Sequence, residues 1–419
     1  MRSSRVIRIT LSCALAAAPV AAQSTRDSAG VQIVESRAPS LATNRTWRVD
    51  QTPLLTIGDH NPLAGADSLY DLSLVMGVAR LGDGRWAVAV QGTNTIRFYD
   101  AKGRFTGSGG RPGQGPGEFQ QVLNLLRLPG DTLLISDVGD AEYFTGTGRW
   151  IRQGGSRAQG VPPYVFPTVA FDDQSFAGLD FNDRTTRTPV DGALPVPLVV
   201  VSRDGLTRSQ VALIPARPAI GDGVRTSLPA FSQSALIASD GRHIIHAYGS
   251  RTEVFVRRRD GQLVRVIRTP RSPTAVTSQL KIDYAAYRRT RAEQFNGGPL
   301  PADQRARLEQ AIARTVYPDL LPALGALLVD PGGNLWARRY DFREAMTVAR
   351  VGRGEGLPSV PTPQFASTWD VFGPDGRWLT TVTMPERFSA LDIGRDYVAG
   401  LERDADDVEM VRVYKLIKP

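Results

Sequence analysis

Apolar and polar positions alternate with a period of two over most of this chain, in short runs interrupted by Gly, Asp, Asn and Pro. The runs are rich in β-branched and aromatic residues, as in "RWAVAV" (85–90) and "TIRFYD" (95–100). Alternation bounded by turn-forming residues is typical of short antiparallel strands. The pattern therefore predicts an all-β protein built from many short strands.

The predicted strands recur in groups of four. Segments 77–110 and 124–155 both read as strand, tight glycine turn, strand, loop, strand, tight glycine turn, strand. Their second turns place Gly103 and Gly148 one propeller blade apart, a repeat of roughly 40–50 residues. These segments thus predict two consecutive four-stranded blades of a β-propeller.

The turn motifs give the number of blades. The turn between first and second strands recurs six times, at 82–85, 129–132, 171–175, 239–242, 330–334 and 392–396. The turn between third and fourth strands recurs only five times, at 100–104, 145–149, 202–206, 258–262 and 373–377. The last blade therefore lacks a fourth strand. We expect "WRVDQTPLLTIG" (47–58) to supply it and to close a six-bladed ring without an exposed sheet edge at the seam.

The glycine-rich stretch "GGRPGQGPGEFQQV" (109–122) has neither the lysine nor the following helix of a phosphate-binding loop. Its glycines fit a crossing from the outer strand of one blade to the inner strand of the next. We expect Phe119 to pack between the two blades.

One insertion, 275–322, has helical periodicity. Its second half (301–318) places apolar residues on one face between two prolines, and its first half (277–295) carries an apolar stripe with Thr277 or Ser278 as N-cap. The insertion predicts a helical hairpin between blades 4 and 5: a lid, a docking arm, or simple packing on the blades.

Every long insertion falls on one face of the predicted ring, in crossovers or in loops between second and third strands: 182–196, 214–229, 275–322 and 352–367. We call this the elaborated face and the opposite, tight-turned side the turn face. Function tends to collect on long loops, and Arg and Tyr are enriched at binding hot spots. The candidate ligand-binding residues are therefore Tyr70, Arg111, Arg184, Tyr248, Arg251, Tyr340 and Arg343.

The segment "GVARLGDGRWAVAVQGTNTIRFYDAKGRF…GRPGQGPGEF" (77–119) resembles an NHL-type repeat. Residues 47–417 as a whole resemble secreted bacterial six-bladed β-propellers of the NHL-repeat and TolB-like type, whose function is unassigned. The resemblance implies a fold and transfers no catalytic residue to this chain.

The N-terminus has the pattern of an export signal, with three arginines, an Ala-rich apolar run and the small residues Val20, Ala21 and Ala22. The run is short for a membrane span, although an uncleaved anchor remains the alternative. We expect a periplasmic or extracellular protein with three parts: a signal peptide (1–22), an N-terminal extension (23–45) and the propeller (46–419).

Composition narrows the chemistry further. The only cysteine, Cys13, lies within the predicted signal, so the mature chain offers no disulfide, thiolate nucleophile or cysteine metal site. The formal net charge of +8 falls to about +5 when the signal is removed, which is weak support for nucleic-acid binding. We expect a monomer with no nucleic-acid partner and no membrane span after cleavage.

The sequence contains no complete catalytic motif. Of its three histidines, His60, His243 and His246, the last two would point to opposite faces of a strand, so no metal site is predicted there. "SQLK" (278–281) lacks the companion elements of S-x-x-K enzymes. Acidic stretches at 137–140 and 403–407 offer oxygen ligands for calcium, but solvated loops are the simpler interpretation.

The leading hypothesis is an exported, non-catalytic binding or scaffold propeller. Its partner, an unknown protein, peptide or glycan, would lie on the elaborated face around the channel mouth, and no cofactor is predicted. The alternative is a metal-dependent, lactonase-like hydrolase or lyase with a divalent cation in the central channel. Three or more carboxylate or imidazole groups converging there would favour the enzyme.

Expression with export should yield a chain that begins at Gln23, as read by N-terminal sequencing and intact mass. A full-length chain retained in the membrane fraction would show instead that residues 1–22 are an uncleaved anchor.

Overall fold

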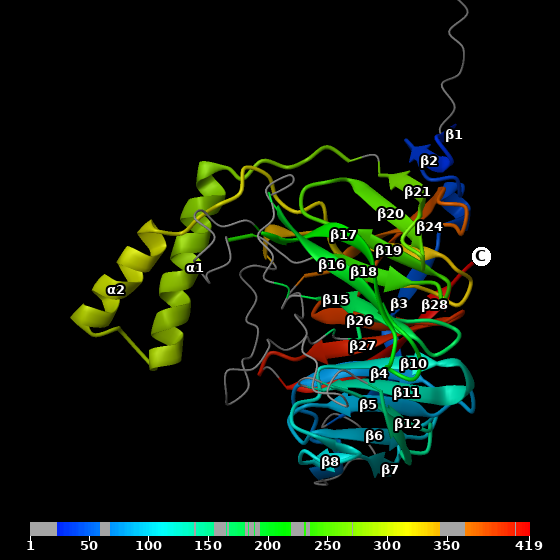
Figure 1. Ribbon diagram of the computed structural model, residues 1–419. Coiled ribbons are helices and arrows are strands. Elements are labelled where there is room, and N and C mark those ends of the chain that lie inside the picture. Colours follow the sequence, from blue (N-terminus) through cyan, green and yellow to red (C-terminus); the bar gives the residue numbers. More distant parts are fainter. Residues whose placement is uncertain are drawn as a thin grey trace, which may run out of the picture.

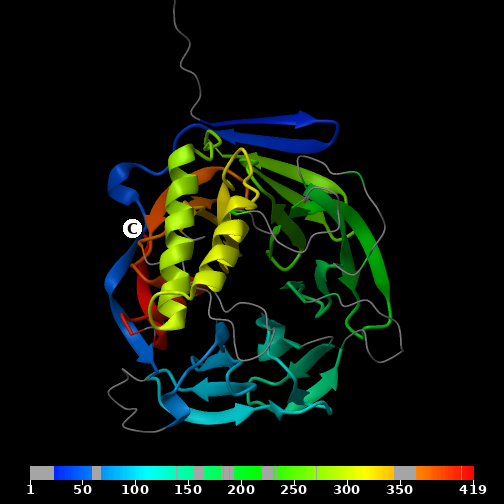
Figure 2. The same ribbon diagram turned by 90° about the vertical axis from the view of Figure 1, so that its left-hand side faces the viewer.

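The computed structural model describes residues 23–58, 68–137, 140–154, 165, 167–180, 183, 188, 193–218, 230–231, 235–269, 271–343, 365–406 and 408–419. Six blades of four antiparallel strands stand around a central axis, and their first strands contact one another at the centre of the ring (Figures 1 and 2). The six-bladed β-propeller that the turn pattern predicts is confirmed.

Each blade runs from the centre outwards in strand order, with the exception of the last. Blades 1 to 3 consist of β4 (Val75–Arg80), β5 (Trp86–Val90), β6 (Thr95–Tyr99) and β7 (Phe105–Gly109); β10 (Asn124–Leu128), β11 (Thr132–Asp137), β12 (Asp140–Phe144) and β13 (Trp150–Gln153); and β14 (Val169–Ala170), β15 (Phe176–Leu179), β16 (Ala193–Val201) and β17 (Arg208–Pro218). Blades 4 to 6 consist of β18 (Leu236–Ser239), β19 (His243–Ala247), β20 (Glu253–Arg258) and β21 (Leu263–Arg268); β22 (Leu324–Val329), β23 (Leu335–Arg339), β24 (Thr368–Phe372) and β25 (Trp378–Thr383); and β26 (Phe388–Ile393), β27 (Tyr397–Arg403), β28 (Glu409–Ile417) and β3 (Arg48–Ile57).

The ring closes as the sequence predicts, because β3 pairs antiparallel with β28 as the fourth strand of blade 6. The register runs from Ile57 opposite Val411 to Arg48 opposite Ile417. The two ends of the described propeller are therefore joined by backbone hydrogen bonds within one sheet.

The hydrophobic core is divided among the blade interfaces. Six clusters of buried side chains each join two neighbouring blades. Between blades 5 and 6, for example, Trp336 and Trp369 pack with Phe388, and all three are essentially fully buried. Burial of each such side chain contributes about 1.5–3 kcal/mol, so every blade is stabilised mainly by its two neighbours.

The glycine-rich stretch 109–122 is a connection between blades. The Glu118 carboxylate accepts hydrogen bonds from the backbone N–H of Gln114 and Gly115 and pairs with Arg111. Phe119 is fully buried between blades 1 and 2, as expected, and its ring lies 5.4 Å from that of Phe144. Gly110 has a φ of 71°, and a Cβ there would lie 2.2 Å from the Phe119 ring, so this position requires glycine.

The segment that precedes β3 forms a strap over three blades. β1 (Gln23–Ser28) and β2 (Val31–Ser36) form a hairpin, and β2 pairs in parallel with β21, which extends the sheet of blade 4 to six strands. The backbone N–H groups of Ser40 and Leu41 then donate to β25 of blade 5 before β3 enters blade 6. Figure 2 shows the hairpin along the outer edge of the ring. We call residues 23–57 the N-terminal strap.

A buried ion pair fixes the seam between blades 6 and 1. Arg403 and Glu409, each about 1% exposed, pair at 2.6 Å, and the Glu409 carboxylate also accepts the backbone N–H of Val75 in β4 at 2.7 Å. Removing one partner of such a pair leaves the other charge buried in the core without a counter-charge.

Glu409→Ala should therefore lower the free energy of unfolding by about 3–5 kcal/mol, measured by chemical denaturation. The control, Asp303→Ala, removes a carboxylate from an exposed ion pair with Arg307 and should cost about 0–1 kcal/mol. Equal effects of the two substitutions would contradict a stabilising role for the seam pair.

Candidate functional site

The predicted helical hairpin lies between blades 4 and 5 and consists of α1 (Ser278–Asn296) and α2 (Ala302–Ala313). The Thr277 side chain caps α1 by accepting the backbone N–H of Leu280 at 3.2 Å. Arg289 of α1 forms a two-bonded ion pair with Glu309 of α2, with both bonds at 2.7 Å. The sequence-predicted hairpin and cap are confirmed.

The two ends of the hairpin insertion lie side by side. The backbone N–H of Val276 donates to the carbonyl of Asp319 at 2.9 Å, and that of Leu321 donates to Thr274 at 2.8 Å. The insertion therefore enters and leaves the propeller at one point, and the blades do not depend on it for chain continuity.

Aromatic side chains anchor the hairpin at its root. Phe231 is 2% exposed, and its ring lies 5.2 Å from Tyr284 of α1 and 6.0 Å from Tyr317. Leu321 and Tyr340 pack in the same cluster, and we call these five residues the aromatic anchor. No described residue of α1 or α2 is fully buried, and Figures 1 and 2 show the pair standing off the blades on one face of the ring.

Two of the sequence-predicted site residues lie in the loop that follows β23. Tyr340 belongs to the aromatic anchor. Arg343 pairs with Asp341 through two bonds of 2.6 and 2.9 Å, and its guanidinium lies 4.0 Å from the centre of the Phe365 ring. These contacts hold the Arg343 side chain in place while leaving it exposed.

Two more lie in the neighbouring loop between β19 and β20. Tyr248 is partly buried, and burial raises the pKa of its hydroxyl to about 12, so the hydroxyl remains protonated well into the alkaline range. Arg251 lies 3.6 Å from Glu253. The backbone of Ala323 bonds both to Gly249 and to Tyr340, so the two loops meet. Tyr248, Arg251, Tyr340 and Arg343 thus share the rim between blades 4 and 5, which we call the anchor rim.

The other three predicted residues are not part of this rim. Tyr70 is buried within blade 1, where its hydroxyl accepts the backbone N–H of Phe105 at 3.0 Å and its ring lies 5.9 Å from Tyr99. Arg111 is exposed on the crossover after blade 1, paired with Glu118. Arg184 lies outside the described residues.

The two histidines of "HIIH" lie in different surroundings. His246 is 4% exposed, stacks on Phe255, and accepts a hydrogen bond from the Nε of Arg257 at 3.1 Å. Burial, together with the charge of Arg257, lowers the pKa of His246 to about 3, so it remains neutral. His243 lies nearer the surface and contacts Asp240 at 2.8 Å. Within the described ranges, no group of three or more His, Cys, Asp or Glu side chains is placed to hold a metal ion.

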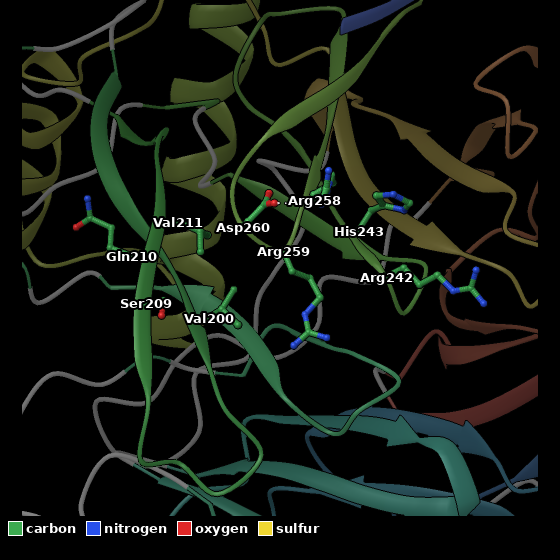
Figure 3. Close-up of a pocket in the computed structure, with 9 residues that line it drawn as sticks. All are labelled: Val200, Ser209, Gln210, Val211, Arg242, His243, Arg258, Arg259 and Asp260. Carbon is green, nitrogen blue, oxygen red and sulfur yellow. Dashed lines mark ion pairs between the residues drawn. The ribbon is translucent and has the colours of Figure 1, made fainter. Parts of the chain in front are cut away.

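A cavity of about 810 Å³ opens between blades 3 and 4 near the turn face (Figure 3). Each of its four basic residues has a carboxylate nearby: Arg242 with Asp172 at 3.8 Å, His243 with Asp240 at 2.8 Å, Arg258 with Asp260 at 3.4 Å and Arg259 with Asp173 at 2.7 Å. In Figure 3 the guanidinium groups of Arg242 and Arg259 lie well apart. Because these paired guanidinium groups do not converge on one point, we do not take this cavity as an anion site.

A second cavity, of about 270 Å³, lies in the central channel and includes Asp392. Sequence reasoning missed this residue because "DIGRD" (392–396) reads as a tight turn. The only signal was an acidic residue at the end of an inner strand, which is indistinguishable in sequence from an ordinary turn aspartate.

Phe231→Ala should release the hairpin without unfolding the ring, because Phe231 contacts two other aromatic members of the anchor. A loss of about 3–5 kcal/mol in this local packing should make proteolysis within 278–313 faster while the melting temperature of the propeller is unchanged. The exposed neighbour Val316, changed to Ala, should have no effect. Unchanged proteolysis of Phe231→Ala would contradict the anchoring role.

No protein-family model matches the chain, and no curated protein matches it. Similar solved structures include a Bacteroides fragilis protein described as exported (9% identity, 92% of this chain and 99% of the other, TM-score 0.48). A member of the duf4221 family from Bacteroides vulgatus has 9% identity, 90% and 99% coverage and a TM-score of 0.46. A gluconolactonase from Xanthomonas campestris has 12% identity, 91% and 100% coverage and a TM-score of 0.42. The similarity is one of fold alone; by its own sheet topology, this chain is a six-bladed β-propeller.

Proposed function

We propose that the protein is an exported binding propeller that holds a protein or peptide partner on its elaborated face, at the anchor rim and the adjoining helical hairpin. One observation carries the proposal. Four of the residues that sequence analysis selects, Tyr248, Arg251, Tyr340 and Arg343, lie in two loops that meet at the root of a projecting helical pair. Loops held by a rigid scaffold are a common place for recognition.

The hairpin insertion exposes apolar side chains that the ring does not cover. Ile282 of α1 is 60% exposed, Val316 is 52% exposed and Leu320 is 37% exposed. Exposed apolar groups near Arg and Tyr are the usual composition of a protein-binding surface. A partner that contacts the hairpin would bury them.

The charge of the hairpin favours an acidic partner. Basic residues outnumber acidic ones along α1 and α2. Two of the acidic side chains, Asp303 and Glu309, are already close to the arginines Arg307 and Arg289. The remaining cations include Lys281 and Arg305, which are exposed and would attract acidic surfaces, with a rate of association that falls as salt is added.

The site of action that we propose is outside the cytoplasm. The supporting feature is the signal-like sequence at 1–22, which lies outside the described residues. No helix among the described residues has the length and apolar character needed to cross a membrane.

The test is to replace residues 277–318 with a short Gly-Ser linker, since the flanking segments are already adjacent. The shortened propeller should keep its melting temperature within about 2–4 °C. Cross-linking in the exported fraction should trap an acidic partner on the intact chain, with cross-links in α1 or α2, and none on the shortened chain. A double variant, Arg251→Gln with Arg343→Gln, should weaken capture while leaving the hairpin in place.

Equal capture by intact and shortened chains would refute the role of the hairpin. Metal analysis separates this proposal from the enzymatic alternative. Stoichiometric divalent metal, with a melting temperature that drops on chelation, would favour a metal-dependent hydrolase or lyase over a binding module.

A further inference from the structure

The channel cavity of about 270 Å³ lies at the turn-face end of the ring, opposite the hairpin. All six inner strands contribute to its wall, and most of the lining residues are apolar, including Leu126, Ile237 and Leu328, although polar atoms make up more of the lining surface than apolar atoms do. Its charged residues are Arg127 and Asp392. Because a water molecule occupies about 30 Å³ of liquid, the cavity has room for a ligand of about nine non-hydrogen atoms.

A β-bulge directs Asp392 into this cavity. In β26, Ala390 pairs with Gly400 and Asp392 pairs with Ala399, so Leu391 is an extra residue. Bulges re-aim side chains and are frequent beside binding sites. Gly400 permits the close approach that the bulge requires, because a Cβ there would lie 2.0 Å from the carbonyl oxygen of Ser389.

The Asp392 carboxylate has one oxygen engaged and one open. Its Oδ2 accepts the backbone N–H of Arg80 at 3.0 Å and the Tyr397 hydroxyl at 2.9 Å. Its Oδ1 accepts no hydrogen bond from any residue that the structure describes. Burial raises the pKa of Asp392 above its usual range, although the carboxyl retains some exposed surface because it faces the channel. A carboxylate whose ionised form is disfavoured by burial, and which still faces a cavity, is typical of a group that binds a ligand.

Arg127 supplies the opposite charge in the cavity wall. Its Nε and Nη2 bond Asp131 at 2.8 Å, whereas its Nη1 has no partner within the described part of the chain. The guanidinium of Arg80 lies over the rings of Trp86 and Tyr397, at 5.7 and 5.0 Å. Arg127 and Asp392, the two charged residues of the cavity wall, carry opposite charges, so the site favours a ligand that also carries both signs of charge.

We propose that this cavity binds a small apolar α-amino acid as its zwitterion. The ammonium group donates to Oδ1 of Asp392, the carboxylate accepts from Arg127, and the side chain lies against Leu126, Ile237 and Leu328. The site is on the turn face and does not depend on a partner at the hairpin.

The experiment is calorimetric titration of the mature protein with leucine and two analogues that each lack one charged group. These are 4-methylpentanoate, which has no amine, and 3-methylbutylamine, which has no carboxylate. Leucine should bind at least tenfold more tightly than either analogue, because each lost partner removes a charge-assisted hydrogen bond. No heat up to the solubility limit of leucine, or equal affinity for all three compounds, would overturn the proposal.

Two variants assign the contacts. Asp392→Asn should weaken leucine and 3-methylbutylamine about tenfold or more and leave 4-methylpentanoate unchanged. Arg127→Gln should weaken leucine and 4-methylpentanoate and leave the amine unchanged. The control is Arg377→Gln, an exposed turn-face arginine near Asp375 that lies outside the cavity lining and should change nothing.

The pH dependence and the stability of Asp392→Asn give independent readouts. Arg80, Arg127 and Tyr397 are the charged and titratable groups that act on Asp392, and Asp131 pairs with Arg127. Leucine affinity should fall on acidification as Asp392 takes up its proton. The raised pKa means that Asp392 destabilises the fold when ionised, so Asp392→Asn should leave the melting temperature at pH 7 unchanged or higher. A lower melting temperature with unchanged leucine binding would show that Asp392 is only a structural link between blades 6 and 1.

Discussion

Antiparallel pairing of β3 with β28 brings segments from opposite ends of the chain into one blade. Without β3, blade 6 would have only three strands, and the interface between blades 6 and 1 would lose Ile57 from its core. Each blade buries its faces only against its neighbours, so the loss of one interface exposes two blades. The pairing therefore stabilises the whole ring, and the buried Arg403–Glu409 pair fixes the same seam on the elaborated face.

A closed ring gives the protein two faces with different chemistry. On the elaborated face, a helical hairpin rests on a small aromatic anchor, so its conformation can vary without disturbing the blades. On the turn face, short turns leave the channel accessible, and a bulge in β26 places a buried carboxylate in it. The first arrangement suits a large partner and the second a small molecule.

Much of the fold follows from the sequence because its signals are local. Strand alternation and two kinds of glycine turn identify the blades, and the missing sixth outer strand identifies 47–58 as the closing strand. Within the strap, β1 and β2 were not predicted as strands, because "QSTRDS" is polar and the pairing of Gln32 with Arg265 joins distant positions. For the anchor rim, the sequence predicts only that the candidate residues lie on the elaborated face, not which of them lie together. Which loops meet depends on long-range packing. Tyr70 is buried in blade 1, where its hydroxyl accepts the backbone N–H of Phe105, and no sequence pattern predicts that contact.

Hydrogen exchange measured by mass spectrometry on the mature chain tests the closed ring most directly. If β3 closes it, the amides of residues 48–57 that bond to β28 should be protected as strongly as those of 409–417, and both sets should open only with global unfolding, while the amides of α1 and α2 exchange faster by local opening. Rapid exchange of 48–57 beside slow exchange of 409–417 would show that β3 is not a permanent strand of blade 6, and would contradict the account.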